Sequence, residues 1–140
     1  MYLVRLLTLT HNVFNRNYRV SIGDIMAKAI VITLGFEEKY AIRALMKRGL
    51  ERGDSIVIIT GPVVEKTRKA IEHLRDFLKY FEDASLSIHE IDEVYDFATS
   101  VRRIRKLLMN LHNSFDNIII NLSGGMRALI IETLIAILLL

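Results

Sequence analysis

The sequence predicts an α/β fold in which helices cover both faces of an open parallel sheet, a three-layer α/β/α arrangement. Short apolar runs rich in β-branched residues alternate four times with longer stretches of helical periodicity. Unbroken apolar runs of this kind are typical of strands that are buried on both faces. Four successive strand–helix units then favour parallel strands joined by right-handed crossovers.

The predicted strands occupy residues 29–33, 55–60, 86–91 and 116–121. The first and second are mostly apolar, as expected for central strands, and the fourth has an apolar centre at residues 118–120. Residues 86–91 instead alternate between apolar and polar side chains, which indicates a strand with one wetter face. The third strand is therefore the expected edge strand.

The predicted helices occupy residues 37–52, 63–81, 94–111 and 125 or 126 to the last residue. In the first three, apolar side chains recur at helical spacing with charged residues between them. Gly53 and Asp54 are expected to end the first helix. The last helix is predicted to be buried and not to span a membrane. Its apolar run from Ala128 to Leu140 is interrupted by Glu132 and is shorter than the roughly 20 residues that a spanning helix needs.

Both ends of the chain differ from the pattern expected of a complete domain. The last predicted helix reaches Leu140 without a polar last turn, so we expect the fold to be truncated after its fourth strand–helix unit, unless a dimer buries that helix end. Residues 1–27 show no clear period and contain a second methionine, Met26, just before the first strand. They are either an N-terminal extension with a strand between residues 2 and 10, or a leader mistaken for protein. We expect residues 28–140 to form one ligand-binding domain that is incomplete at its C-terminus.

The composition fits one domain of 140 residues. Most of the formal net charge of +3 lies before residue 28, so the domain is nearly neutral, which argues against a large nucleic-acid-binding surface. The absence of Cys excludes disulfides and thiolate metal sites and fits a cytoplasmic location. The absence of Trp and Gln, with abundant Ile, Lys and Glu, leans toward a heat-adapted organism.

The turn from Asn121 to Arg127 is the main candidate site, because it joins the fourth strand to the fourth helix. Gly124 and Gly125 let the backbone turn sharply and bring its N–H groups close to a ligand. The start of the helix adds unpaired donors that suit a phosphate. Ser123 could cap the helix or donate to the ligand, and Arg127 could pair with a phosphate. The alternative is a tight turn with a Ser cap and a solvated Arg.

A second loop follows the first strand and ends at the same edge of the sheet. Ligands of open α/β sheets bind at this edge, near the switch in strand order. Thr33 could offer a hydroxyl, Gly35 could permit close approach, and Phe36 could stack on a base. Phe36 could equally pack on the first helix. Asn121 could either brace the neighbouring loop or contact the ligand.

The other polar clusters give little support for catalysis or metal binding. The four His residues are scattered and have no metal-ligand spacing, so no metal site or cofactor is expected. No Ser-His-Asp arrangement can be argued, and no catalytic residue is assigned. The third predicted helix carries a basic cluster that forms either a solvated face or a nucleic-acid contact: Arg102, Arg103, Arg105 and Lys106.

The two loops together resemble a known family. A Thr-x-Gly-Phe loop after the first strand and an Asn-x-Ser-Gly-Gly-x-Arg motif after the fourth are similar to those of CRISPR-associated Rossmann-fold (CARF) domains. The Gly-Met-Arg sequence and the helix after Gly61-Pro62 are most similar to the archaeal transcription-regulator subfamily, whose members carry a C-terminal winged helix-turn-helix. The resemblance implies a Rossmann-like sheet.

The resemblance also implies a homodimer that binds cyclic oligoadenylate, commonly the tetra-adenylate, across its two-fold axis. Thr33, Gly35 and Phe36 would line one wall of that site. The second motif would hold phosphate and ribose, with the last helix at or near the dimer interface; its residues are Asn121, Ser123, Gly124, Gly125 and Arg127. DNA would be bound only through a further C-terminal domain.

Two other functions remain open at the level of sequence. Some CARF proteins are ring nucleases that cut the bound ring without a metal. Arg127 is a poor general acid because its guanidinium does not deprotonate, so binding is favoured over cleavage. The second alternative is a generic nucleotide-binding or interaction module.

Overall fold

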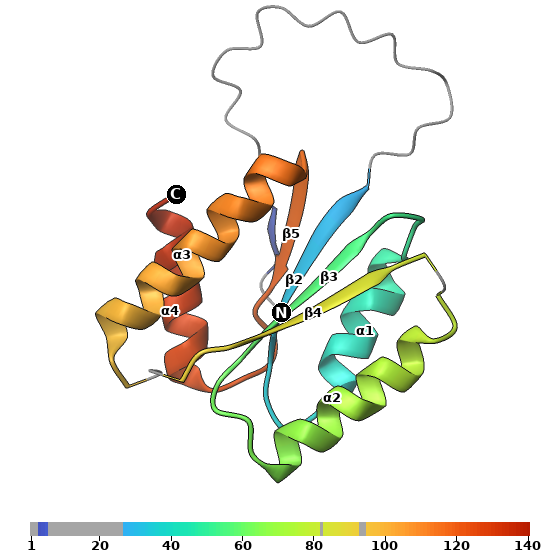
Figure 1. Cartoon of the computed structure of the whole chain (residues 1–140), viewed down its shortest axis with the longest axis horizontal. Coiled ribbons are helices and arrows are strands. Elements are labelled where there is room, and N and C mark those ends of the chain that lie inside the picture. Colours follow the sequence, from blue (N-terminus) through green and yellow to red (C-terminus); the bar gives the residue numbers. More distant parts are fainter. Residues whose placement is uncertain (1–2, 6–26, 82, 93–94) are drawn as a thin grey trace, which may run out of the picture.

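The computed structural model describes residues 3–5, 27–81, 83–92 and 95–140, and within them four parallel strands alternate with four helices (Figure 1). Helices α1 and α2 cover one face of the sheet, and α3 and α4 cover the other. The predicted three-layer α/β/α fold is confirmed. In chain order the elements are β1 (Leu3–Arg5), β2 (Lys28–Leu34), α1 (Lys39–Arg48), β3 (Ser55–Thr60), α2 (Glu65–Leu78), β4 (Ser85–Glu90), α3 (Phe97–Ser114), β5 (Asn117–Asn121) and α4 (Arg127–Leu138).

The sheet has the strand order β1-β5-β2-β3-β4. Strands β5, β2, β3 and β4 are parallel, whereas β1 pairs antiparallel with β5 and places Leu3 opposite Asn121. Strand β1 lies within residues 2–10, where one of the two interpretations of this segment placed a strand, but its antiparallel pairing departs from the parallel sheet that was predicted. Three residues in a segment without periodicity give no pattern from which a strand partner could be inferred. The rest of the segment interpreted as an extension or leader lies outside the described residues.

The core consists of two apolar clusters, one on each face of the sheet, because successive side chains of a strand point to opposite faces. Val31, Val57 and Ile120 belong to the cluster beneath α3 and α4, together with Leu108 and Leu129. The alternate strand residues, including Ile32 and Ile58, join α1 and α2 in the second cluster. This burial on both faces explains why the centres of these strands are apolar.

Helix boundaries differ from the sequence prediction by up to four residues, and the structure gives the reason for two of them. Helix α1 ends at Arg48 and not near residue 52, because Gly49 adopts a φ of 73° and its N–H donates to Leu45 O at 2.8 Å. Helix α3 begins at Phe97, where Asp96 accepts hydrogen bonds from the backbone N–H and the hydroxyl of Thr99 at 3.4 and 2.9 Å. The predicted start at residue 94 lies outside the described residues.

The third predicted strand is the outermost parallel strand, as its alternation indicated. Strand β4 pairs only with β3 among the described residues, and most of its side chains are partly exposed. None of the helices in the described part of the chain is long and apolar enough to cross a membrane.

Candidate functional site

The order of the strands places a topological switch point between β2 and β5. From β2 the chain moves outward to β3 and β4, and α3 then returns it to the other side of β2. The loops that leave β2 and β5 therefore diverge to helices on opposite faces of the sheet. In open α/β sheets, ligands bind in the crevice between such loops.

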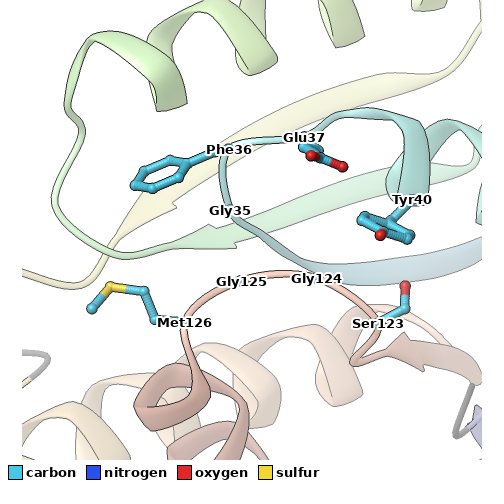
Figure 2. Close-up of a pocket in the computed structure, with 8 residues that line it drawn as sticks. All are labelled: Gly35, Phe36, Glu37, Tyr40, Ser123, Gly124, Gly125 and Met126. Atoms are coloured by element: carbon cyan, nitrogen blue, oxygen red, sulfur yellow. The ribbon is translucent and has the colours of Figure 1, made fainter.

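A pocket of about 430 Å³ lies at this point, between the two loops that the sequence singled out (Figure 2). Phe36 and Met126 lie toward one end of it, and Tyr40 and Ser123 lie toward the other. Five of the predicted site residues line it: Gly35, Phe36, Ser123, Gly124 and Gly125. Three lining residues were not predicted: Glu37, Tyr40 and Met126.

Thr33 and Asn121 lie beneath the pocket and hold its loops together. Thr33 is 1% exposed, and its Oγ1 donates to Gly124 O at 2.5 Å, which ties the β2 loop to the β5 loop. Asn121 is 2% exposed, and its Oδ1 accepts from the backbone N–H of Ser123 at 2.9 Å and from the Ser123 hydroxyl. The Asn121 side chain therefore braces the turn that follows its own strand, and its contact with a ligand stays a prediction.

The glycines let the two backbones touch. A Cβ on Gly124 would lie 2.9 Å from Thr33 O, and one on Gly35 would lie 3.1 Å from both the Cα and the N of Gly125. Gly125 also has a φ of 97°, a conformation that disfavours any residue with a Cβ. Backbone atoms of these glycines consequently form much of the pocket between its two ends.

Helix α4 begins with its backbone donors uncapped. Its N-cap residue is Met126, and no side chain caps the helix, since Asn121 engages the Ser123 hydroxyl. Capping by Ser123, one of the two roles considered for it, is therefore wrong, and its donation to a ligand stays a prediction. Arg127 is exposed and makes no hydrogen bond or ion pair with another described residue, but it does not line the pocket. Free helix-terminal N–H groups and a nearby unpaired guanidinium suit an anion.

Two aromatic rings with partial exposure border the pocket. Phe36 is 56% exposed and Tyr40 is 40% exposed. Phe36 thus does not form the buried contact with the first helix that was its alternative role. Each ring has a lysine ammonium above it: Lys66 Nζ is 5.6 Å from the centre of the Phe36 ring, and Lys39 Nζ is 5.2 Å from that of Tyr40. Exposed rings of this kind can stack on a base.

Glu37, Tyr40 and Met126 line the pocket but were not predicted from the sequence. Tyr40 looked like one more position on the first helix, and only its place one turn after the Phe36 loop could have indicated the pocket. Met126 was treated as the residue before Arg127. Its sulfur would lie 3.1 Å from a Cβ on Gly61, so Met126 also packs against the loop that leads to α2.

The basic cluster on α3 is partly engaged within the protein. Arg105 Nε donates to Leu139 O at 2.8 Å, and Arg103 donates to Glu90 O at 3.3 Å. Within residues 27–81, 83–92 and 95–140, no group of three or more His, Asp or Glu side chains could hold a metal ion.

The fold and the pocket together define a Rossmann-like α/β domain with a ligand-sized pocket at its switch point. The chain belongs to the family described as the Csa3 CRISPR-associated Rossmann-like domain, which matches residues 28–140. The resemblance to CRISPR-associated Rossmann-fold domains is therefore confirmed.

One relative is named "CRISPR locus-related putative DNA-binding protein Csa3" and comes from Saccharolobus solfataricus. It is 35% identical to this chain over 109 residues, which cover 77% of the chain and 44% of the relative. The chain thus matches less than half the length of that relative.

Proposed function

We propose that this domain is the sensor of a CRISPR-linked regulator and binds cyclic oligoadenylate, with tetra-adenylate as the expected ring, in the pocket between the β2 and β5 loops. The observation that supports the proposal most directly is the pocket itself. The loops after β2 and β5 are far apart in the sequence, but they meet at this pocket through the hydrogen bond from Thr33 to Gly124 O. A ligand site at a switch point is the usual arrangement for this fold.

The lining suits a nucleotide. Backbone N–H groups at Gly124, Gly125 and the start of α4 can donate to phosphate, and Arg127 adds a positive charge nearby. Phe36 and Tyr40 offer exposed rings on which a base can stack. A volume of about 430 Å³ is typical of a pocket for one small ligand, for which the usual range is about 300–1,000 Å³.

A second copy of the pocket would let the site hold a symmetric ring. A homodimer with a two-fold axis presents the same surface twice and so matches a ligand with two-fold symmetry. Helix α4 starts at the pocket and exposes an apolar stripe one, two and three turns along. Its members are Ile131, Leu134 and Leu138, which are 50%, 40% and 76% exposed. We place the dimer interface on this stripe.

DNA contact in our proposal belongs to a part of the whole protein outside residues 28–140. The matched relative carries DNA binding in its name, and the chain matches 44% of that relative. The domain itself is nearly neutral, which disfavours a large DNA-binding surface on it. Ring binding would alter the relative orientation of two attached DNA-binding units through the dimer.

Calorimetric titration with cyclic tetra-adenylate tests the proposal. We expect one ring to bind per dimer, and linear tetra-adenylate of the same composition to bind much more weakly, because it is not preorganised. Arg127→Gln should weaken binding of the ring and reduce its salt dependence. A folded dimer that gives no heat with the ring over a range of concentrations and temperatures would overturn the assignment.

Metal-independent cleavage of the ring is the second candidate function, and the carboxylate of Glu37 in the pocket lining favours it. In this reaction Glu37 takes the proton from a ribose 2′-hydroxyl as that oxygen attacks the adjacent phosphate, which breaks the bond from phosphorus to the 5′-oxygen and leaves a 2′,3′-cyclic phosphate. The protonated Glu37 then returns the proton to the departing 5′-oxygen, which leaves as a hydroxyl. Chromatography of the ring after incubation with the protein separates the two functions. Cleavage that disappears in Glu37→Gln would support the nuclease, and an intact ring would exclude it.

A further inference from the structure

Two lysines lie above the aromatic rings of the pocket, but they come from different elements. Lys39 is the first residue of α1, directly before Tyr40, the residue whose ring it covers. Lys66 belongs to α2 and reaches across to the ring of Phe36 at 5.6 Å. Helix α2 thereby places a positive charge beside a pocket that is lined by Tyr40 of α1 and by the loops before α1 and α4.

The charge of Lys39 is compensated locally. Its ammonium lies 2.7 Å from the carboxylate of Glu37, which lines the pocket, so the two charges largely cancel at the site. Both side chains are more than half exposed, so the pair contributes little to stability. Lys39 therefore adds little net charge for an incoming anion.

The charges around Lys66 on α2 are also paired with one another. Arg68 bonds to Glu65 at 2.6 Å and to Glu72, and Lys69 lies 4.0 Å from Glu65. Lys66 makes no ion pair with any residue in the described ranges, and its contact is the ring of Phe36. It is thus a cation without a carboxylate partner, held over an aromatic ring of the pocket.

We propose that Lys66 is a ligand-binding residue of this pocket and pairs with a phosphate of the nucleotide whose base stacks on Phe36. The inference rests on the proposed function and adds a residue from outside both sequence motifs. In the free protein the cation–π contact keeps the ammonium beside the site. When the base covers the ring, the ammonium moves to the phosphate and gains a charge-assisted hydrogen bond.

This arrangement places cations on two sides of the ligand. Arg127 lies at the start of α4, whereas Lys66 lies in the first turn of α2. Met126, directly before α4, packs against the loop at Gly61 that leads into α2. A ligand with phosphates on both sides of a base, as in an oligonucleotide ring, can engage both cations at once.

The test compares Lys66→Gln with Lys69→Gln by calorimetric titration with cyclic tetra-adenylate at several salt concentrations. The two substitutions remove the same charge from the same helix, but Lys69 pairs with Glu65 and contacts no aromatic ring of the pocket. We expect Lys66→Gln to weaken binding by about 10-fold, as for the loss of a hydrogen bond to a charged group. Its salt dependence should become shallower by about one unit of slope, as for one lost phosphate contact.

Lys69→Gln should retain the affinity and the salt slope of the unchanged protein, and Lys66→Arg should recover most of the loss. If the unchanged protein binds the ring but the two Gln variants have the same affinity and the same salt slope, the proposed role of Lys66 is overturned. The proposed function of the domain would then still stand. Failure of the unchanged dimer to bind the ring would overturn the proposed function and this inference together. Matching thermal unfolding curves for the two Gln variants exclude a folding defect as the cause of a difference.

Discussion

Thr33 links the two halves of the pocket through one buried hydroxyl. Its Oγ1 lies 2.5 Å from Gly124 O and 3.4 Å from Asn121 O, so it joins the end of β2 to both the strand and the turn on the other side of the switch point. Water cannot replace this contact, since Thr33 is 1% exposed. Thr33 therefore shapes the site without lining it.

Thr33→Val should destabilise the domain by about 1–3 kcal/mol, because it leaves the partly buried carbonyl oxygen of Gly124 without its donor. Thr33→Ser keeps the hydroxyl and should recover much of that loss. Urea unfolding followed by circular dichroism measures both values. A Val variant as stable as the unchanged protein would show that the hydroxyl does not hold the loops.

Gly124→Ala should separate the loops, since the new Cβ would lie 2.9 Å from the rigid backbone oxygen of Thr33. The expected cost is about 1–3 kcal/mol of stability, as for other overpacked sites, with loss of ring binding. Gly61→Ala is the matched control, because its Cβ would meet only the flexible end of Met126 at 3.1 Å. Calorimetry and thermal unfolding on both variants make the comparison, and equal effects would contradict it.

At the scale of the element, α4 differs from the other helices by having a carboxyl group buried within an apolar helix. Glu132 is 1% exposed where α4 packs on α3, and its Oε2 has no hydrogen-bond partner in the described part of the chain. Burial raises the pKa of Glu132, and a hydrogen bond with Ser100 of α3 opposes part of that effect. The folded protein thus binds the Glu132 proton more tightly than the unfolded chain does.

The sign of the resulting pH dependence follows from linkage. A carboxyl group with a raised folded-state pKa stabilises the fold fully below its ordinary value of 4.5, and that contribution is lost as pH rises through the folded-state pKa. Glu132→Gln stays neutral, so the unfolding free energy of the unchanged protein should fall relative to the variant by up to about 1.4 kcal/mol per pH unit within that window. Chemical unfolding at a series of pH values from 4 upward measures the difference. A difference that stays constant with pH would contradict the assignment.

The elements that the sequence predicted well are those whose pattern and environment agree. The strands at 55–60 and 116–121 were predicted to within one residue at each end, because short β-branched apolar runs are typical of buried strands. Boundaries set by one local torsion were missed, as at Gly49, where two glycines a few residues apart could each have ended α1. The short antiparallel β1 left no periodic signal at all.

The candidate site was predicted where it lies on loops and missed where it lies on helices. Gly35 and Gly124 stand out in a sequence because turns demand them. Tyr40 and Lys66 do not, because an exposed aromatic or Lys on a helix usually faces solvent, and only the tertiary arrangement turns these two toward one pocket. Whether Thr33 and Asn121 point into the pocket or beneath it likewise depends on side-chain direction, which spacing does not give.

At the scale of the whole molecule, the strand order decides where each helix layer meets the pocket. Because β5 lies beside β2, the helix after β2 covers one face and the helix after β5 covers the other (Figure 1). The pocket therefore lies between the two layers, and α4 leads from it along an outer face of the domain. A ligand there could alter the position of α4, and through α4 the packing of a second copy.

The proposed dimer is sensitive to the central residue of the exposed α4 stripe. Leu134→Lys should yield a monomer in sedimentation velocity, because each copy loses the burial of a leucine, about 1.5–3 kcal/mol, and each must desolvate an unpaired ammonium. A two-fold interface contains this residue from both copies, so each substitution affects the dimer twice. Met46→Lys is the matched control, since Met46 is 70% exposed on α1, on the other face of the sheet, and should leave the dimer intact.

The Leu134→Lys monomer should also bind cyclic tetra-adenylate far more weakly in calorimetry, because a monomer offers one pocket to a ring that the dimer holds with two. A Leu134→Lys protein that remains dimeric would move the interface away from α4, and a monomer that keeps full affinity would show that one pocket is sufficient for the ligand.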